Sequence, residues 1–582
     1  MSPGGFRRFV LWARPYRGAY LRGAAWLVAT NVLALGIPWL LRGAIHDLEK
    51  GTNARRLALF ALGMAGLALA QGFVRTFSRL AILGASRKIA FDVREAFYAK
   101  LLTLDARFYD SFRIGDVMSR GVNDLQLLQS FYGPGLMNAL NTAVVYVGVV
   151  AVMLRIDAVL TLVALALFPL LYFGVNRMSK RVYQRSLAVQ EQLASISNRA
   201  QENLAGIQQV KIYAREEQEI AAFRALASTH RDRNLAFARI RGAMVSLIGI
   251  FSGAGTLLVL FVGGLHVIHG RITLGDFVAF NAYLGQLAWP TIALGWIVNV
   301  FQRAAGAMTR LDEVLLAEPA IPPPALPAEG VIPVDGDVAI RGLTFAYPGS
   351  EDRPALEDVD LNIPKGSRVA IVGGVGSGKS TLAHLLARVY PVPAGTIAIG
   401  GDDLATTPVE RVRAGIGFVP QEAFLFSRPL HENVAYGAPG ASAARVDEAV
   451  ALARLTGDLT ALPDGLATVV GERGFTLSGG QRQRATLARA IACDPRLLIL
   501  DDALSSLDAE TERMVLLGLD RALAGRTLVL ITHRASTLRA VDRIVVLERG
   551  RVVEDGPHAA LLARGGVYAR LFRRLDLEEN LA

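Results

Sequence analysis

Six apolar stretches in the first half of the chain constrain the fold most strongly. Each is close to the roughly 20 residues that an α-helix needs to cross the hydrocarbon core of a bilayer. Hydrophobic residues make up 52% of the 582-residue chain, more than a typical soluble protein carries. We therefore predict six membrane-spanning helices, at Tyr20–Leu41, Leu57–Phe77, Gly133–Leu154, Ala158–Asn176, Met244–Ile268 and Phe277–Val300.

The connections between these predicted spans differ in length and in charge. Two of them, Ser78–Tyr132 and Arg177–Gly242, are long, charged and helical in pattern, whereas the others are shorter. Basic residues concentrate in the two long connections, which favours a cytoplasmic location for both of them and for both chain termini. We expect them to be helical levers that dock on another part of the chain, although solvated cytoplasmic helices would give the same pattern.

Charge and cysteine content exclude several classes of protein. The formal net charge is +11, and in a membrane protein such an excess faces anionic lipid, so we expect no nucleic-acid partner. The single cysteine, Cys493, rules out an intrachain disulfide and a cysteine metal cluster. The basic N-terminus precedes an apolar run without a small-residue cleavage site, so we interpret that run as an uncleaved membrane segment.

Several amide side chains lie inside the predicted spans. They can line a pathway through the membrane or hold neighbouring helices together by hydrogen bonds, and the sequence favours neither interpretation. They include Asn31, Gln71, Asn138, Asn141, Asn281 and Gln286.

A change of pattern after the last span marks a second domain. Glu318–Gly336 is rich in proline, which is typical of an extended, semi-rigid linker. From Val338 onward, apolar strands, glycine turns and helices alternate, which is the pattern of an α/β fold. The chain is therefore predicted to join an all-α membrane domain to an α/β domain.

A glycine-rich loop in the α/β half indicates a nucleotide site. Gly373–Ser380 has the form G-x-x-x-x-G-K-S, between a predicted strand and a predicted helix. Glycines let backbone N–H groups turn toward phosphate oxygens, Lys379 can reach the outer phosphates, and Ser380 can hold Mg²⁺. Tyr347, ahead of this loop, can stack on adenine, and a packing role is the alternative. The loop residues predicted to bind the nucleotide are Gly373, Gly374, Val375, Gly376, Ser377, Gly378, Lys379, Ser380 and Thr381.

Polar side chains end the other apolar strands of this half. Two carboxylates end Leu497–Asp502, where Asp501 can bind Mg²⁺ and Asp502 can activate an attacking water. Gln421 follows another strand and can sense Mg²⁺ or the γ-phosphate of the nucleotide. His533 also ends a strand, and because ligands bind at the carboxyl ends of such strands, we predict that it contacts the γ-phosphate.

One stretch, Leu477–Gln481 (LSGGQ), lacks a role inside a single nucleotide site. Ser478 and Gln481 fit a capping box at the start of a helix. Ser478, Gly479 and Gly480 would then present a hydroxyl and bare N–H groups, which is a second phosphate-binding surface. We predict that this surface serves a nucleotide held by another chain, in a dimer with ATP between the subunits. A merely capped helix is the alternative.

Together these motifs resemble the ATP-binding cassette family, and the resemblance covers the whole chain. Six spans with long cytoplasmic extensions ahead of one cassette resemble a half-transporter of the exporter type. Gly373–Ser380 resembles the Walker A loop and Leu497–Asp501 resembles Walker B. By the same resemblance, the remaining motifs are the A-loop (Tyr347), the Q-loop (Gln421), the X-loop (Val470–Gly474), the signature (Leu477–Gln481), the D-loop (Ser505–Asp508) and the switch histidine (His533).

The resemblance implies a multi-domain architecture and a function. An all-α six-helix transmembrane domain would occupy residues 1–316, a proline-rich linker 317–336, and an α/β P-loop nucleotide-binding domain 337–582. Short coupling helices would lie near Ser111–Asp116 and Arg215–Gln218, in a dimer with twelve spans. The expected activity is ATP- and Mg²⁺-dependent export of hydrophobic small molecules, lipids or peptides from a bacterial inner membrane, with the nucleotide-binding domain in the cytoplasm.

The chain departs from the family pattern at Asp502, where the family has a glutamate that acts as the catalytic base. Aspartate is one methylene shorter, and a positioned general base contributes about 10²–10⁴-fold to a rate. We therefore expect the site built on Lys379 and Asp501 to hydrolyse ATP slowly, and the chain to pair with a different subunit that carries the glutamate. A homodimeric exporter or lipid flippase, and a regulatory ATP-binding subunit, are the alternatives.

Overall fold

Two compact units make up the chain, and a short segment of its first half belongs to the second unit. The helical unit comprises Met1–Tyr98 and Met118–Leu315, and the C-terminal unit comprises Ala99–Val117 and Leu316–Ala582. The computed structural model describes residues 3–51, 53–323, 331–471, 474, 476–522 and 524–581. Parts of the predicted linker (324–330) and of the predicted X-loop (472, 473) therefore lie outside the described residues.

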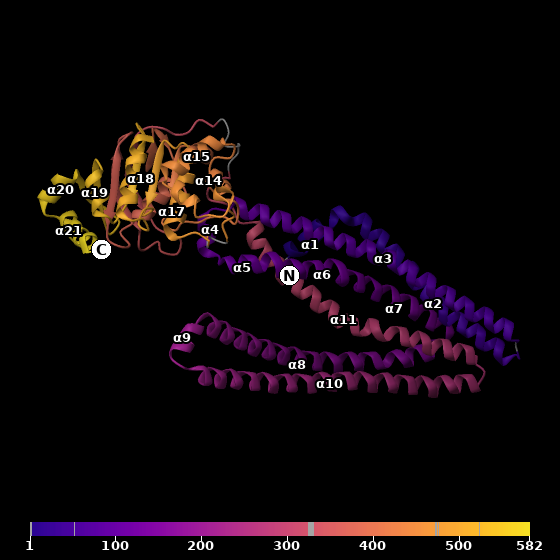
Figure 1. The fold of residues 1–582 in the computed structure, drawn as a ribbon. Helices are drawn as coiled ribbons and strands as arrows, with labels where there is room; N and C mark the ends of the chain where they lie inside the picture. Colours follow the sequence, from indigo (N-terminus) through magenta and orange to yellow (C-terminus); the bar gives the residue numbers. More distant parts are fainter. Residues whose placement is uncertain are drawn as a thin grey trace. The chain divides into compact units, whose positions relative to one another are not determined.

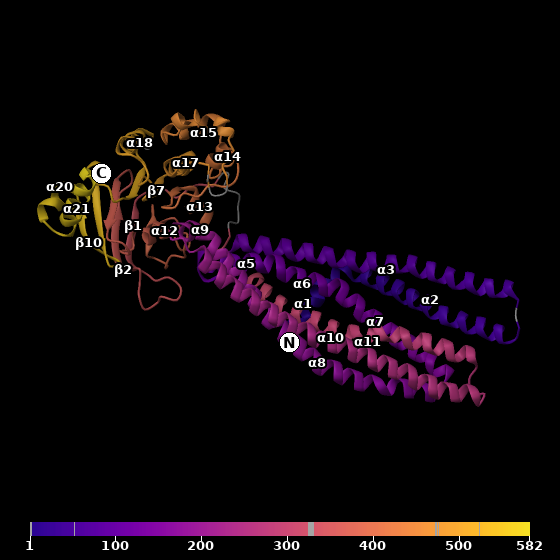
Figure 2. The same cartoon turned by 60° about the horizontal axis from the view of Figure 1, so that its bottom comes forward.

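Long α-helices build the helical unit, and α8 and α10 run side by side in both ribbon views (Figures 1 and 2). A 3-10 turn at Arg14–Tyr16 joins the first two helices, and π-helical turns at Arg120–Asp124 and Phe131–Gly135 flank the sixth. The helices of the unit are α1 (Pro3–Ala13), α2 (Arg17–Glu49), α3 (Ala54–Thr103), α6 (Leu125–Ser130), α7 (Leu136–Ile156), α8 (Ala158–Ala205), α9 (Ile207–Ile212), α10 (Glu216–Ile268) and α11 (Leu274–Leu315).

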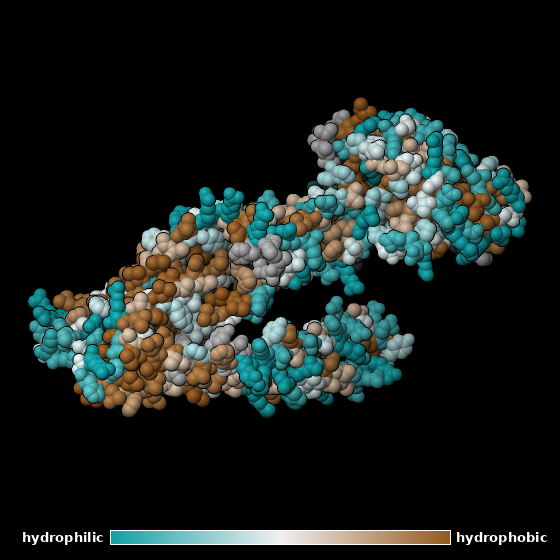
Figure 3. Space-filling model, turned by 180° about the vertical axis from the view of Figure 1, so that it is seen from behind, coloured by the Kyte–Doolittle hydropathy of each residue, from teal (hydrophilic) through white to brown (hydrophobic). Residues whose placement is uncertain are grey.

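Within the described residues, five helical stretches are long and apolar enough to cross a membrane. Each contains one predicted span, and the hydrophobic band over these helices is visible in Figure 3, with hydrophilic surface at the helix ends. The predicted span Ala158–Asn176 lies on α8, where the side chains of Leu167, Phe168, Leu171, Tyr172 and Asn176 are outside the described residues. The five stretches are Arg7–Glu49, Ala54–Thr103, Ile114–Ile156, Glu216–Ile268 and Leu274–Leu315.

Amide side chains tie the helices of this unit to one another. The Asn31 side chain of α2 donates a hydrogen bond to Asn141 Oδ1 of α7, at 3.1 Å. The Gln286 side chain of α11 donates to the Ala34 carbonyl of α2, at 3.4 Å. Hydrogen bonds of this kind hold transmembrane helices together because lipid offers no alternative partner. For Asn31, Asn141 and Gln286 the structure therefore shows the second of the two predicted roles, that of holding neighbouring helices together.

Two sheets form the frame of the C-terminal unit. The antiparallel sheet has the strand order β2-β1-β4-β5, and the second sheet has the order β10-β9-β3-β8-β7-β6. All neighbours in the second sheet are parallel except β9 and β10. The strands are β1 (Val338–Phe345), β2 (Leu356–Ile363), β3 (Arg368–Gly373), β4 (Ile397–Ile399), β5 (Asp402–Asp403), β6 (Ile416–Val419), β7 (Leu497–Asp501), β8 (Thr527–Ile531), β9 (Arg543–Glu548) and β10 (Arg551–Gly556).

Helices cover the second sheet, and every residue of β7 and β8 is buried. Central parallel strands are apolar along their whole length because both faces pack against other layers. The helices are α4 (Ala106–Ser111), α5 (Ile114–Ser119, which crosses the unit boundary), α12 (Lys379–Leu386), α13 (Val409–Ala414), α14 (Leu430–Ala435), α15 (Ala443–Leu452), α16 (Thr456–Leu459), α17 (Gly479–Ala492), α18 (Ala509–Ala522), α19 (Ala535–Ala540), α20 (His558–Arg564) and α21 (Val567–Leu581), with a 3-10 turn at Gly465–Ala467.

The short helix α4 comes from the first long connection but packs within the C-terminal unit. Asp105 caps it, accepting a hydrogen bond from the Arg107 N–H. Asp105 also accepts hydrogen bonds from the backbone N–H groups of Ala320 and Ile321. This first connection therefore docks as predicted, although its docking helix lies just before the predicted Ser111–Asp116. The tip of the second connection, around α9, belongs to the helical unit.

Candidate nucleotide-binding site

The carboxyl ends of the parallel strands bring the predicted site residues to one edge of the sheet. In the ladder of β3, β8 and β7, Ile371 lies opposite Ile531, and Ile531 lies opposite Asp501. The glycine loop follows β3, and His533 follows β8. Because ligands bind at this edge of open α/β sheets, the sheet topology accounts for the grouping of these motifs.

The glycines of the loop are required by close backbone contacts. A Cβ on Gly373 would lie 2.1 Å from the Leu547 carbonyl oxygen, and a Cβ on Gly378 would lie 2.5 Å from the Ala355 carbonyl oxygen. Gly378 also has a φ of +100°, a conformation that L-residues with side chains rarely adopt. No residue other than glycine fits these two positions without moving the backbone.

Inside the loop, the side chains of Lys379 and Ser377 can bind an anion. Lys379 Nζ donates hydrogen bonds to the carbonyl oxygens of Gly373, at 2.9 Å, and Gly374, at 2.8 Å. Burial lowers the pKa of the Lys379 ammonium below its ordinary value. The buried Ser377 hydroxyl has no hydrogen-bond partner. An unpaired donor and a buried cation in one glycine loop fit the phosphates of a nucleotide.

Ser380 and Asp501 form an oxygen-rich pair at the start of α12. Ser380 Oγ donates a hydrogen bond to Asp501 Oδ1, at 3.0 Å. Asp501 is only 2% exposed, and it forms no ion pair with a described Lys or Arg. Burial raises the pKa of the Asp501 carboxyl, and the Ser380 hydrogen bond lowers it in part. A hydroxyl and a buried carboxylate without a cationic partner are the ligands that Mg²⁺ prefers, so these residues fit that ion.

Asp502 turns the chain immediately after β7. Its φ is +48°, in the left-handed region that aspartate tolerates better than most residues, and its N–H donates to the Ile531 carbonyl at 2.9 Å. Burial raises the pKa of the Asp502 carboxyl, and the neighbouring charge of Asp501 adds to this. Burial, and then the charge of Lys379, lowers the pKa of His533. His533 is therefore neutral at pH 7 and can either accept or donate a hydrogen bond.

Among the described residues, Tyr347 and Gln421 make no hydrogen bond with Lys379, Asp501 or His533. The Tyr347 hydroxyl shares a hydrogen bond of 3.0 Å with Thr381 Oγ1 in the first turn of α12. Its ring packs edge-on against Tyr390, with ring centroids 5.2 Å apart. Gln421 follows β6 and is exposed, and no hydrogen bond joins it to the other predicted ligands among the described residues.

Leu477–Gln481 forms the predicted capping box at the start of α17. Ser478 Oγ accepts from the Gln481 N–H at 3.2 Å, and Gln481 Oε1 accepts from the Ser478 N–H at 2.9 Å. Ser478 is exposed, and a Cβ on Gly479 would meet nothing closer than 3.8 Å. Packing inside the chain therefore does not account for Gly479. Among the described residues, no hydrogen bond links this stretch to the glycine loop.

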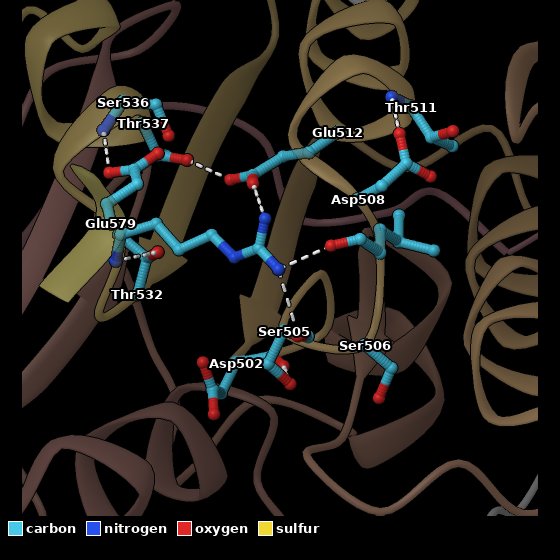
Figure 4. A network of polar contacts seen from close by, with 12 residues as sticks. Asp502, Ser505, Ser506, Asp508, Thr511, Glu512, Thr532, Ser536, Thr537 and Glu579 are labelled. Atoms are coloured by element: carbon cyan, nitrogen blue, oxygen red, sulfur yellow. Dashed lines mark hydrogen bonds and ion pairs between the residues drawn. The ribbon is translucent and has the colours of Figure 1, made fainter. Parts of the chain in front are cut away.

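A polar network that was not predicted from the sequence connects α18, the D-loop and the strand end that carries His533. Arg534, next to the switch histidine, pairs with Glu512 of α18 at 2.6 Å and donates to the carbonyl oxygens of Ser505 and Leu507 in the D-loop. Figure 4 shows Glu512 facing Thr537, with Ser505 and Asp502 on the neighbouring loop. The network therefore fixes the D-loop relative to the strand end that carries His533.

The signature helix joins the same network. The Gln483 side chain of α17 donates to Ser505 Oγ at 3.3 Å and accepts from the Ser506 N–H at 3.0 Å. Ser505 Oγ in turn donates to the Asp502 carbonyl at 2.9 Å. The only sequence signal for these contacts was the position of Arg534 beside His533. A glutamate on an amphipathic helix, such as Glu512, is ordinarily exposed, but here it is 2% exposed.

Comparison with known proteins identifies the family. The ABC transporter transmembrane region matches residues 21–291, and the ABC transporter family matches residues 356–505. A probable multidrug resistance ABC transporter ATP-binding/permease protein of Bacillus subtilis is 33% identical over 553 residues, covering 95% of this chain and 94% of that protein. An ATP-dependent lipid A-core flippase of Chromobacterium violaceum is 32% identical over 564 residues, covering 95% of each chain.

A solved structure agrees in fold. The structure of a bacterial Atm1-family ABC exporter with ATP bound superposes with a TM-score of 0.79 at 27% identity, covering 96% of this chain and 99% of that one. Both the helical unit and the cassette are thus matched in one chain. The chain belongs to the ABC transporter family: it is a multi-pass membrane protein of the ABC exporter type that binds and hydrolyses ATP to drive transport.

Proposed function

We propose that this chain is one half of a dimeric exporter of hydrophobic or amphipathic substrates. The observation that carries the proposal is that one chain holds two candidate phosphate-binding surfaces, the Lys379 loop and the exposed N-terminus of α17, and that no hydrogen bond joins them among the described residues. Each surface is half of a site, so a second subunit must complete both. ATP then drives transport because it binds the closed pair of cassettes better than the open pair.

In this proposal the site residues have distinct roles. Lys379 and the loop N–H groups bind the phosphates, and Ser380, Asp501 and Gln421 hold Mg²⁺. Asp502 orients and deprotonates the attacking water, and neutral His533 contacts the γ-phosphate. The Mg²⁺ would supply charge neutralisation at the phosphates. Ser478, Gly479, Gly480 and Gln481 would act on the nucleotide of the partner subunit, and Tyr347 would stack on adenine.

We infer further that the dimer is asymmetric. The Asp502 carboxylate is attached one methylene closer to a backbone that the left-handed turn and the Ile531 hydrogen bond already fix. A base so held falls short of a water positioned for a glutamate, which supports slow hydrolysis at this site. The intact capping box supports a signature, Leu477–Gln481, that can act on the nucleotide bound by a partner chain. That partner chain would carry the glutamate.

A second candidate function is lipid flipping by a homodimer. The observation that favours it is the 32% identity with an ATP-dependent lipid A-core flippase over nearly the whole chain. In either case we propose a bacterial inner membrane location with both termini and the cassette in the cytoplasm. The basic residues of the two long connections support this orientation.

Transport in proteoliposomes tests the export function. The chain, alone and with a candidate partner, is reconstituted with a fluorescent amphiphile, and its ATP-dependent accumulation is followed. We expect accumulation that is lost in Lys379→Ala and kept in Lys365→Ala, a lysine of the same unit that pairs with Asp335 away from the loop. Accumulation that persists in Lys379→Ala would contradict ATP-driven export by this chain.

A further inference from the structure

The side chain of Gln481 makes a hydrogen bond outside the capping box. Its Oε1 accepts from the Ser478 N–H at 2.9 Å, and its Nε2 donates to Asp458 Oδ1 at 3.2 Å. Asp458 belongs to α16 (Thr456–Leu459), 23 residues earlier in the chain. Because the two bonds use opposite ends of one amide, the bond to Asp458 determines which end of the amide faces Ser478.

Arg484 holds the Asp458 carboxylate in this position. Its Nη2 donates to Asp458 Oδ2 at 2.6 Å, and its Nε is buried without a hydrogen-bond partner. Among the described residues, Asp458 is the only acceptor for the Arg484 side chain. Gln481 and Arg484 lie three residues apart on α17, so their side chains leave the helix on the same face. Each oxygen of the carboxylate therefore accepts from one side chain of that face.

The position of α16 is itself fixed by apolar packing. Leu455, just before α16, is 1% exposed and belongs to the core cluster that also contains Leu477, the first residue of the signature. Gln483 lies two residues after Gln481, and so on the opposite side of α17, where it bonds to the D-loop. The first turn of α17 is thus held from two sides, by α16 and by the D-loop.

We propose that Asp458 is a positioning residue for the signature. Its carboxylate can only accept, so it keeps Gln481 Nε2 turned toward α16 and Oε1 on the Ser478 N–H. A reversed amide would bring two donors together at Ser478 and would open the capping box. Asp458 contacts no nucleotide, but it fixes the turn that presents the Ser478 hydroxyl and the N–H groups of Gly479 and Gly480. The inference rests on the proposed function, in which this surface completes the nucleotide site of another chain.

An exchange of donor and acceptor between the two side chains tests the positioning. In Gln481→Glu, a carboxylate faces the Asp458 carboxylate at the place where the amide donated. In the double variant Asp458→Asn/Gln481→Glu, the asparagine donates to the glutamate and accepts from Arg484, and the net charge equals that of the wild type. The double variant therefore restores, with reversed polarity, the contact that Gln481→Glu breaks. Asp458→Leu removes the acceptor altogether.

Hydrogen exchange over Leu477–Gln481, measured by mass spectrometry on the full chain in lipid nanodiscs without nucleotide, reports on the capping box. Both N–H groups of the box are protected only while it is closed. We expect exchange about fivefold faster in Gln481→Glu and in Asp458→Leu, and a return to within about twofold of the wild type in the double variant.

The matched control is Asp464→Leu, which should leave the exchange unchanged. Asp464 is an exposed aspartate six residues after Asp458, and its side chain makes no hydrogen bond among the described residues. Exchange in Asp458→Leu at the wild-type rate, or exchange in the double variant as fast as in Gln481→Glu, would overturn the inference.

ATP turnover by the same variants in lipid separates this inference from the proposed function. A misdirected signature should lower the turnover at saturating MgATP about fivefold and change the KM for ATP less than about twofold, because the Lys379 loop still binds the nucleotide. The double variant should regain the wild-type turnover. A contact that only stabilises the fold would leave the turnover per nucleotide-binding chain unchanged.

The two measurements fail in different ways. Turnover lowered in Gln481→Glu, with neither exchange nor turnover restored in the double variant, would overturn the positioning by Asp458 and leave the proposed function in place. Exchange that follows the expected pattern, with equal turnover in all variants, would contradict the proposed role of the signature in hydrolysis and not the positioning of Gln481.

Discussion

Asp502 is the residue that the proposed mechanism assigns as the catalytic base. It ends a fully buried strand, its backbone is held in a left-handed turn, and burial raises the pKa of its carboxyl. A carboxylate in this position can act as a base only when it is ionised. His533 must be neutral at the same time, and its lowered pKa provides for that.

These two directions define a pH window. Because the pKa of Asp502 is raised above 3.8, its carboxylate becomes protonated, and the base is lost, at a pH higher than 3.8. The His533 pKa is lowered from 6.5, so the ring becomes charged only below 6.5. We expect the acid limb of the ATPase rate to lie above pH 3.8, measured in lipid at saturating MgATP. An acid limb centred at or below pH 3.8 would contradict this assignment.

Glu512 is a residue whose role is structural. It is 2% exposed and accepts from Arg534 and from Thr537. Removing one partner of a buried ion pair leaves the other charge unmatched, which typically costs about 3–5 kcal/mol. Because Arg534 is a quarter exposed and keeps two carbonyl partners, we expect Glu512→Leu to cost about 3 kcal/mol, at the lower end of that range.

Thermal unfolding of the full chain in detergent measures this effect. The matched control is Glu510→Leu, an exposed glutamate on the same helix, which should leave the unfolding midpoint nearly unchanged. Equal midpoints for the two variants would show that the network does not hold the D-loop.

At the scale of elements, α4 links the transmembrane helices to the cassette. It continues the chain of α3, and the Tyr390 hydroxyl donates to its Asp110 at 2.9 Å. Tyr390 in turn packs edge-on against Tyr347, whose hydroxyl meets Thr381 at the nucleotide loop. A short path of contacts within the C-terminal unit therefore runs from Thr381, at the glycine loop, to α4.

Tyr390→Phe removes one hydrogen bond of this path and keeps the ring packing. A hydrogen bond to a charged group contributes about 1.5–3 kcal/mol, so we expect cargo stimulation of the ATPase to fall several-fold. Basal ATPase should change less than twofold. The control is Tyr568→Phe, which removes another buried hydroxyl of the same unit, bonded to His558 instead of α4. Cargo stimulation that is equal in the two variants would argue against coupling through Tyr390.

The sequence predicts some elements of this structure and not others. The spans and the glycine loop were predictable because hydrophobic length and local motif spacing determine them. The capping box was predictable for the same reason, since Ser478 and Gln481 are neighbours on one helix turn. The Arg534–Glu512 ion pair was not predictable, because its residues lie 22 positions apart and only the tertiary fold brings them together. The start of α4 was not predicted, because its cap, Asp105, looks like any loop aspartate in the sequence.

At the scale of the whole molecule, the proposed function makes this chain one transport half that provides half of each nucleotide site. In the proposed dimer, its Lys379 loop and its Ser478 surface each meet a complement from another subunit. The resident carboxylate after β7 is an aspartate, so the site built on this chain's own loop is the weaker one in the proposed asymmetric dimer. A partner with a glutamate would then provide most of the hydrolysis.

The ATPase rate of this chain purified alone in lipid, beside its Asp502→Glu variant, tests that claim most directly. We predict slow turnover by the wild type and a rise of at least tenfold in Asp502→Glu, because the longer side chain brings the base to the water. Asp502→Asn should abolish the residual rate. Fast turnover by the wild type alone, unchanged by Asp502→Glu, would contradict the account and leave a symmetric homodimer as the working exporter.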